Sequence, residues 1–213
     1  MLNWDDWGTW NGSSYNYSEG NDYDLFLYDS AGLVIASSNN DQTAGAPPEE
    51  FVIDIAGSTG WRYIRIYKWF AARDCKLELF FWEGSNLEYS EPAGSLAIPA
   101  DSPYVVAVGA TDWSDDSYHF YSSQGPTSDG RIKPDLVAPS GVSGATYGNL
   151  GFFGTSASVP HVAGAIALLK GKLPYTLDDI KSVIEARALD LGSSGKDNLF
   201  GLGRLKLSKE NED

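Results

Sequence analysis

The sequence predicts a chain of two parts, an all-β antiparallel region over residues 1–95 and an α/β region over residues 96–207, followed by a polar tail at 208–213. Apolar residues alternate with polar ones through most of the first part, as in half-buried strands. The second part contains two stretches with the spacing of helices. The formal charge also differs: residues 1–95 carry 15 acidic and 5 basic side chains (−10), and residues 96–213 carry 14 and 10 (−4).

Charge and length exclude several classes of function. The whole chain has a net charge of −14, and such a surface repels phosphate backbones, so no nucleic-acid partner is expected. No run approaches the roughly 18 apolar residues that a membrane helix needs, so no membrane partner is expected either. The start Met1-Leu-Asn-Trp-Asp-Asp lacks the basic and apolar parts of a signal peptide. A single cysteine, Cys75, excludes an internal disulfide.

Five apolar runs separated by Gly, Asp, Asn and Pro predict the strands of the first part. They are Asp24–Asp29, Leu33–Ala36, Phe51–Ile55, Trp61–Trp69 and Leu77–Trp82. Short strands at this spacing, with no helix between them, are typical of an antiparallel sandwich or jelly roll.

Three carboxylates in this part could bind calcium. Asp22, Asp24 and Asp29 lie on or beside one predicted strand, and carboxylate oxygens at alternate positions are the hard ligands that calcium prefers. The alternative interpretation is a solvated strand end in which Asp29 forms a turn. Calcium would be structural, and no other cofactor is expected.

Tryptophans form the second feature of the first part. Exposed rings on a sandwich can stack on sugars, whereas buried rings are core, and the core interpretation is favoured. The residues concerned are Trp4, Trp7, Trp10, Trp61, Trp69 and Trp82.

The second part predicts a sheet buried on both faces with helices beside it. The runs Tyr104–Gly109 and Ile132–Pro139 are continuous and apolar, as in buried parallel strands. A helix is expected from about Ser156 to Lys172, and since it is small and apolar nearly all round, we expect it to be buried. A second helix is expected from an N-cap at Thr176 to Gly192.

Ser156 is the candidate nucleophile. It follows Gly154, which permits a tight turn, and it begins the predicted buried helix. There the free backbone N–H groups and the positive end of the helix dipole favour a developing oxyanion. The alternative is that Ser156 is merely an N-cap.

The segment Gly154-Thr-Ser-Ala-Ser-Val-Pro-His-Val-Ala-Gly164 resembles the nucleophile signature of the subtilisin-like serine peptidases, the subtilases. Further segments agree in order. They are Pro99-Ala, Val105–Ala110, Ser122-Ser-Gln-Gly-Pro126, Gly130–Pro139 and Gly201-Leu-Gly-Arg204. The resemblance covers roughly residues 97–207 and implies that Ser156 is the catalytic serine. Residues 1–95 resemble the β-rich, pre-peptidase C-terminal-like insertion that some subtilases carry.

The sequence also departs from the family pattern. In subtilases the catalytic Asp, the His and the oxyanion Asn precede the serine and the insertion. Of the two histidines here, His161 matches a structural family position and His119 matches no catalytic motif. Asn3 has the wrong context for the oxyanion role. A serine without a base is barely nucleophilic at neutral pH, so we expect the chain alone to lack activity.

Two functions follow as hypotheses. The first is the nucleophile-bearing part of a secreted serine endopeptidase, whose partners would be a polypeptide substrate and an N-terminal segment that bears the other catalytic residues. The alternative is a non-catalytic β-sandwich module that binds calcium, a glycan or a protein, beside an inert peptidase remnant. A purely structural shielding role is a third possibility.

Overall fold

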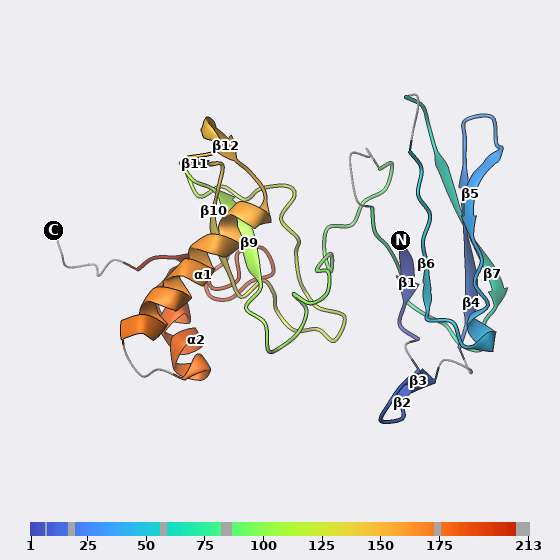
Figure 1. Ribbon diagram of the computed structural model, residues 1–213, viewed down its shortest axis with the longest axis horizontal. Coiled ribbons are helices and arrows are strands. Elements are labelled where there is room, and N and C mark those ends of the chain that lie inside the picture. Colours follow the sequence, from blue (N-terminus) through green and yellow to red (C-terminus); the bar gives the residue numbers. More distant parts are fainter. Residues whose placement is uncertain (7, 17–19, 56–58, 82–86, 173–175, 208–213) are drawn as a thin grey trace. The chain divides into compact units, whose positions relative to one another are not determined.

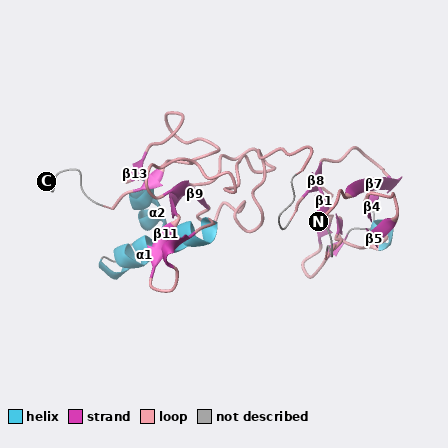
Figure 2. Cartoon of the chain, turned by 90° about the horizontal axis from the view of Figure 1, so that it is seen from above, coloured by secondary structure: helices cyan, strands magenta, loops and turns pink. Residues whose placement is uncertain are grey.

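The computed structural model describes residues 1–6, 8–16, 20–55, 59–81, 87–172 and 176–207 (Figure 1). The chain divides into two compact units, Met1–Leu87 and Glu88–Asp213. Both α-helices belong to the second unit (Figure 2). No helix in the described ranges is long and apolar enough to cross a membrane.

Two three-stranded antiparallel sheets form most of the first unit. One sheet has the order β5-β4-β7, with strands Val34–Ser38, Asp22–Tyr28 and Tyr63–Phe70. The other has the order β6-β1-β8, with strands Glu49–Glu50, Leu2–Trp4 and Leu77–Leu79. The remaining elements are the hairpin of β2 (Thr9–Trp10) and β3 (Tyr15–Asn16) and a 3₁₀ turn, η1, at Gln42–Ala44.

The core of the first unit joins its two sheets. Leu2 and Trp4 from β1 pack with Tyr23 and Leu25 from β4, and all four side chains are buried. The rings of Trp4 and Tyr23 meet edge to face, with centroids 5.1 Å apart, a favourable aromatic geometry. Trp4 is therefore a core tryptophan.

The predicted antiparallel pairing is confirmed for β4, β5 and β7, whereas the jelly-roll or sandwich topology stays a prediction. The strand predicted at Phe51–Ile55 is wrong: pairing with β1 ends at Leu2↔Glu50, because β1 is only three residues long. β1 itself escaped the sequence analysis. β8 ends at Leu79, and Trp82 lies outside the described residues.

A four-stranded mixed sheet forms the centre of the second unit. Its order is β13-β14-β10-β9, with strands Ala188–Leu189, Arg204–Leu205, Leu136–Ser140 and Val108–Asp112. β9, β10 and β14 run parallel, and β13 is an antiparallel edge. The hairpin of β11 (Val142–Gly144) and β12 (Gly148–Phe152) leads from β10 to the first helix.

Two helices pack with this sheet: α1 at Thr155–Lys172 and α2 at Leu177–Glu185. Val162 of α1 and Ile184 of α2 meet Leu136 and Ala138 of β10 in one buried cluster. In Figure 1 α1 crosses β9 and β10, with α2 beside it. The predicted α/β arrangement with parallel strands is confirmed for these elements.

Three boundaries in this unit differ from the prediction. β9 starts at Val108 rather than Tyr104, because Ala107 N donates to the side chain of Asp135 and Val105 O accepts from that of Lys133. β10 starts at Leu136 rather than Ile132. α2 begins after the predicted N-cap, Thr176, but ends at Glu185, since the chain then enters β13.

The expectation that α1 is buried nearly all round is wrong. Its sheet side is buried at Ala157, Ser158, Val162 and Ala165. On the other side the small residues Pro160, Ala163 and Ala167 are exposed. Val159 and Leu168 lie at the two edges of this face, about 180° apart on the helix, with exposed fractions of 46% and 62%. One apolar face of α1 is therefore uncovered.

Candidate functional site

Ser156 is exposed and is the second residue of α1. Within the described part of the chain its hydroxyl has no hydrogen-bond partner. Because the first N–H groups of a helix have no partner inside that helix, the positive end of α1 lies at this side chain. The hydroxyl can therefore meet a solvent-borne carbonyl group, and an oxyanion formed there would be stabilised.

The turn that precedes Ser156 is fixed at Gly154. Gly154 has a φ of +107°, a conformation that glycine adopts without strain. Its carbonyl accepts a hydrogen bond from Ala157 N at 2.9 Å, so the turn closes across Ser156. Its N–H donates to Ser140 Oγ at 2.9 Å and to the Tyr121 hydroxyl at 3.3 Å.

Tyr121 and Ser140 were missed by the sequence analysis. Tyr121 directly precedes the motif Ser122-Ser-Gln-Gly-Pro126, and Ser140 directly follows the motif that ends at Pro139. Nothing in their spacing signals that two hydroxyl groups 19 residues apart lie 2.7 Å from each other. Only the parallel pairing of β9 with β10 brings the two segments together.

Two side-chain contacts hold the first turns of α1 in place. The Ser158 hydroxyl is buried and donates to Pro139 O of β10 at 3.3 Å. His161 Nδ1 lies 2.8 Å from Ala157 O, the carbonyl one turn before it, so His161 is engaged in its own helix. Pro160 is the sixth residue of α1, which begins at Thr155.

His119 belongs to a different cluster. Its Nε2 lies 3.8 Å from Asp112 Oδ2, and its ring stacks on Tyr121 with centroids 4.7 Å apart. Hydrogen bonds from the Ser114 hydroxyl and backbone N–H lower the pKa of Asp112. Among the described residues, neither His119 nor His161 forms a hydrogen bond with Ser156.

The predicted calcium ligands divide into two groups. Asp29 accepts hydrogen bonds from Ala31 N and Leu33 N, each at 2.9 Å, so it forms the turn after β4. Burial, followed by the charges of Asp24, Asp41 and Glu50, raises the pKa of Asp22. Burial and the charge of Glu50 likewise raise the pKa of Asp24. In the described ranges no three His, Cys, Asp or Glu side chains are arranged to hold a metal ion.

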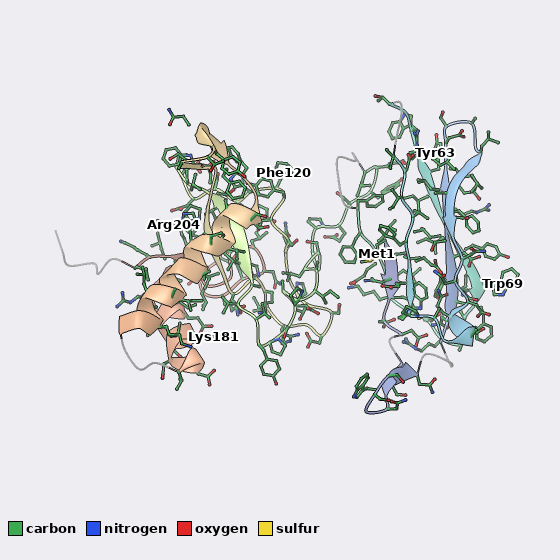
Figure 3. All side chains as sticks on the ribbon, in the orientation of Figure 1. Met1, Tyr63, Trp69, Phe120, Lys181 and Arg204 are labelled. Atoms are coloured by element: carbon green, nitrogen blue, oxygen red, sulfur yellow. The ribbon has the colours of Figure 1, made fainter. Side chains whose placement is uncertain are left out.

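The other tryptophans differ from Trp4. The exposed fraction is 58% for Trp10, 66% for Trp61 and 69% for Trp69, so the core interpretation is wrong for these three. Trp7 and Trp82 lie outside the described residues. Tyr63 and Trp69, at the two ends of β7 (Figure 3), and Tyr67 between them are exposed.

Comparison with known families gives one match of high coverage. The model of the "Subtilase family" peptidases matches residues 32–203. The match includes Ser156 and every motif of the second unit up to Gly203. It begins well before residue 97, where the motifs of the resemblance begin.

Individual proteins agree. The chain is 33% identical over 162 residues to bacillopeptidase F of Bacillus subtilis, which covers 73% of this chain and 10% of that protein. It is 39% identical over 112 residues to subtilisin Savinase of Lederbergia lenta, covering 52% of this chain and 39% of the relative. It is 50% identical over 62 residues to an extracellular serine protease of Serratia marcescens, covering 29% and 6%. The chain thus spans well under half the length of these relatives.

The solved structure of the Clostridium perfringens CspB protease has a similar fold. It covers 87% of this chain and 47% of its own, with a TM-score of 0.58 and 18% sequence identity. The similarity at this identity concerns the fold alone.

Proposed function

The chain belongs to the subtilase family, and from that premise we propose that it supplies the nucleophile of a serine endopeptidase, with Ser156 as that nucleophile. The observation that carries this proposal is the position of Ser156, exposed and without a hydrogen-bond partner among the described residues at the amino end of α1. An N-cap serine would instead use its hydroxyl on the helix backbone.

The proposed reaction is acyl transfer. Ser156 Oγ attacks the carbonyl carbon of the scissile peptide bond and its proton passes to a general base. The N–H groups at the start of α1 stabilise the charge on the carbonyl oxygen. The C–N bond then breaks, the amine leaves with the proton, and water hydrolyses the ester formed on Ser156.

The general base is proposed to come from outside these 213 residues. His161 is bonded within α1 and His119 lies beside Asp112, so neither is placed to take the proton. The uncovered apolar face of α1, with Pro160, Ala163 and Ala167 between the edge residues Val159 and Leu168, supports the view that a further segment packs there. We propose that this segment also carries the acid and the base, and that the 213 residues alone are inactive.

Complementation tests the proposal. The chain is mixed with the N-terminal segment of a subtilase that carries the catalytic Asp and His, and hydrolysis of a fluorogenic peptide is measured. Activity is expected in the mixture, not in either part alone, and it should be lost in Ser156→Ala. Ser182→Ala on α2 is the matched control, because that hydroxyl bonds Asp178 O within its own helix. Activity that survives Ser156→Ala would refute the assignment.

We also propose a type for the first unit and a location for the full-length protein. Two antiparallel sheets around one core support an inserted β-sandwich of the pre-peptidase C-terminal type. One matched relative is an extracellular protease by name, which supports secretion of the full-length protein. The expected substrate is a polypeptide.

A second candidate function is glycan binding by the first unit, favoured by the exposed aromatic residues of β7. Tyr63, Tyr67 and Trp69 share the odd-numbered positions of β7 with Arg65, and their exposed fractions are 54%, 46% and 69%. The rings of Tyr67 and Trp69 are 6.0 Å apart and tilted by 48°. Trp69 also lines, with Phe70 and Thr43, a shallow hollow of about 350 Å³. Amphipathic rings on an exposed surface favour stacking on sugar rings.

A pull-down on insoluble chitin, cellulose and peptidoglycan tests this function. Retention of the chain on one of them, lost in Trp69→Ala and kept in Trp10→Ala, would support it, because Trp10 belongs to a separate hairpin. Equal retention of both variants, or none of the unsubstituted chain, would refute it.

A structural calcium ion beside Asp22 and Asp24 stays a proposal as well. Both carboxylates have raised pKa values through burial and the negative charge of their neighbours, and a cation would relieve that repulsion. Asp29 is left out of the ligand set because its oxygen forms the turn.

A further inference from the structure

We propose that the hydroxyl groups of Tyr121 and Ser140 are positioning groups for Ser156, which act by holding the N–H of Gly154. This inference rests on the proposed role of Ser156 as nucleophile. Tyr121 lies on the loop after β9 and Ser140 at the end of β10, and neither contacts the reacting atoms itself.

Three polar atoms meet at the entrance of α1. Gly154 N donates to Ser140 Oγ at 2.9 Å and, at 3.3 Å, to the hydroxyl of Tyr121. The two oxygens are 2.7 Å apart, and either can donate to the other. Ser140 is fully buried, so its hydroxyl is not exchanging this contact for one with water.

These bonds restrict the backbone torsions of Gly154, which glycine can otherwise change more freely than any other residue. Gly154 has no side chain, and its φ of +107° lies in a region that glycine leaves easily. Its carbonyl is fixed by Ala157 N and its N–H by the two hydroxyl groups. With both backbone groups held, neither of the two peptide planes that flank Gly154 can turn, and the backbone orientation in which α1 presents Ser156 is set.

The two hydroxyl groups are themselves rigidly mounted. Ser140 is the last residue of β10, where it pairs with Asp112 of β9 and accepts a bond from Trp113 N at 3.1 Å. The Tyr121 ring lies flat on His119, at an interplanar angle of 14°. The central sheet is thereby connected to the nucleophile turn through side chains, in addition to the backbone of the β11–β12 hairpin.

Loss of a positioning group slows the reaction of Ser156, whereas loss of a stabilising group lowers the melting temperature. Tyr121→Phe keeps the ring stacked on His119 and removes the bonds of its hydroxyl to Gly154 N and to Ser140 Oγ. Ser140→Ala removes the shorter bond. Tyr118→Phe is the matched control, since the Tyr118 hydroxyl donates to Ser122 O in the same loop and has no contact with Gly154.

The test measures the rate at which a fluorophosphonate probe modifies Ser156 in the complemented chain, across a range of pH, together with the melting temperature and the amide NMR signal of Gly154. We expect Ser140→Ala and Tyr121→Phe to slow modification by roughly ten- to a hundredfold, with an unchanged pH profile. The amide signal of Gly154 should move upfield in both variants. In Tyr118→Phe the probe should modify Ser156 at the rate of the unsubstituted chain.

The outcomes separate this inference from the one beneath it. The probe could modify Ser156 in the unsubstituted chain and in both variants at the same rate, although the Gly154 signal moves. That result would refute the positioning role and leave the assignment of Ser156 as nucleophile intact. If rates fall only in proportion to lost folded protein, the role is structural and the inference is likewise refuted. If the probe does not modify Ser156 in the unsubstituted, complemented chain, both the proposed function and this inference are refuted.

Discussion

Lys133 and Asp135 form an ion pair whose two side chains are only 4% and 3% exposed. Lys133 Nζ also donates to Val105 O at 2.8 Å, and Asp135 accepts a bond from Ala107 N at 2.9 Å. A second lysine, Lys196, approaches the same carboxylate at 3.0 Å. The pair therefore connects the segment before β9 with the start of β10 and with the loop before β14.

Removing Asp135 should strongly destabilise the second unit. Asp135→Ala leaves the buried ammonium group of Lys133 without its charge partner, and breaking such a pair costs about 3–5 kcal/mol. Urea denaturation followed by near-UV circular dichroism measures the free energy of unfolding. Asp129→Ala is the control, because the carboxylate of Asp129 is largely exposed beside Arg131, and it should change little. Equal effects of the two substitutions would contradict the role given to Asp135.

The same residue predicts a loss of stability in acid. Burial opposes ionisation of Asp135, but hydrogen bonds from Lys133, Ala107 and Lys196 outweigh it and lower its pKa. A lowered pKa in the folded state contributes stability above the unfolded pKa of about 3.9, which is lost as the pH falls through the folded value. The unfolding free energy should therefore drop below about pH 4, and less steeply in Asp135→Asn. Parallel curves for both proteins would rule out this contribution.

Glu50 should be a main support of the first unit. It is fully buried and accepts hydrogen bonds from Asn40 N and Gln42 Nε2, both at 2.7 Å. Glu50→Ala leaves these donors unpaired, at a cost of at least about 2 kcal/mol. Its exposed neighbour Glu49 provides the control substitution, which should be nearly neutral. The midpoint of urea unfolding of the chain distinguishes the two, and a neutral Glu50→Ala would be inconsistent with this network.

Calcium binding can be tested through stability. If Asp22 and Asp24 hold the ion, adding calcium chloride should raise the melting temperature, since a ligand that binds only the folded state stabilises it. Asp22→Asn should abolish that increase. Asp29→Asn should keep it, because asparagine can accept the same turn bonds from Ala31 N and Leu33 N. If calcium chloride leaves the melting temperature of the unsubstituted chain unchanged, the proposed calcium site is refuted.

Much of the second unit could be predicted from the sequence, since its signals are local. The N-cap at Thr176 is confirmed, with a reciprocal bond between Thr176 and Asp179, and helix α1 ends where expected. The start of β9 could not be predicted, because the side chains of Lys133 and Asp135 bond Val105 O and Ala107 N, two backbone groups that a strand would pair. Such competition depends on partners almost 30 residues away.

The first unit was harder to predict for a different reason. β1 is a three-residue strand whose Leu2 and Trp4 complete the core, and so short a segment has no periodicity to detect. The exposed rings of β7 match the predicted alternation, but alternation does not say which face is covered. At the site, the position of Ser156 at the start of a helix followed from its motif, whereas the contact of Tyr121 with Ser140 depends on the pairing of β9 with β10.

The most direct measurement of the central claim is the identity of the residue that a fluorophosphonate probe modifies. The complemented chain is treated with the probe and digested with trypsin, and the modified residue is located by tandem mass spectrometry. We expect a single adduct on Ser156, absent when the complementing segment is left out. An adduct on another serine, or none on Ser156 in the complemented chain, would contradict it.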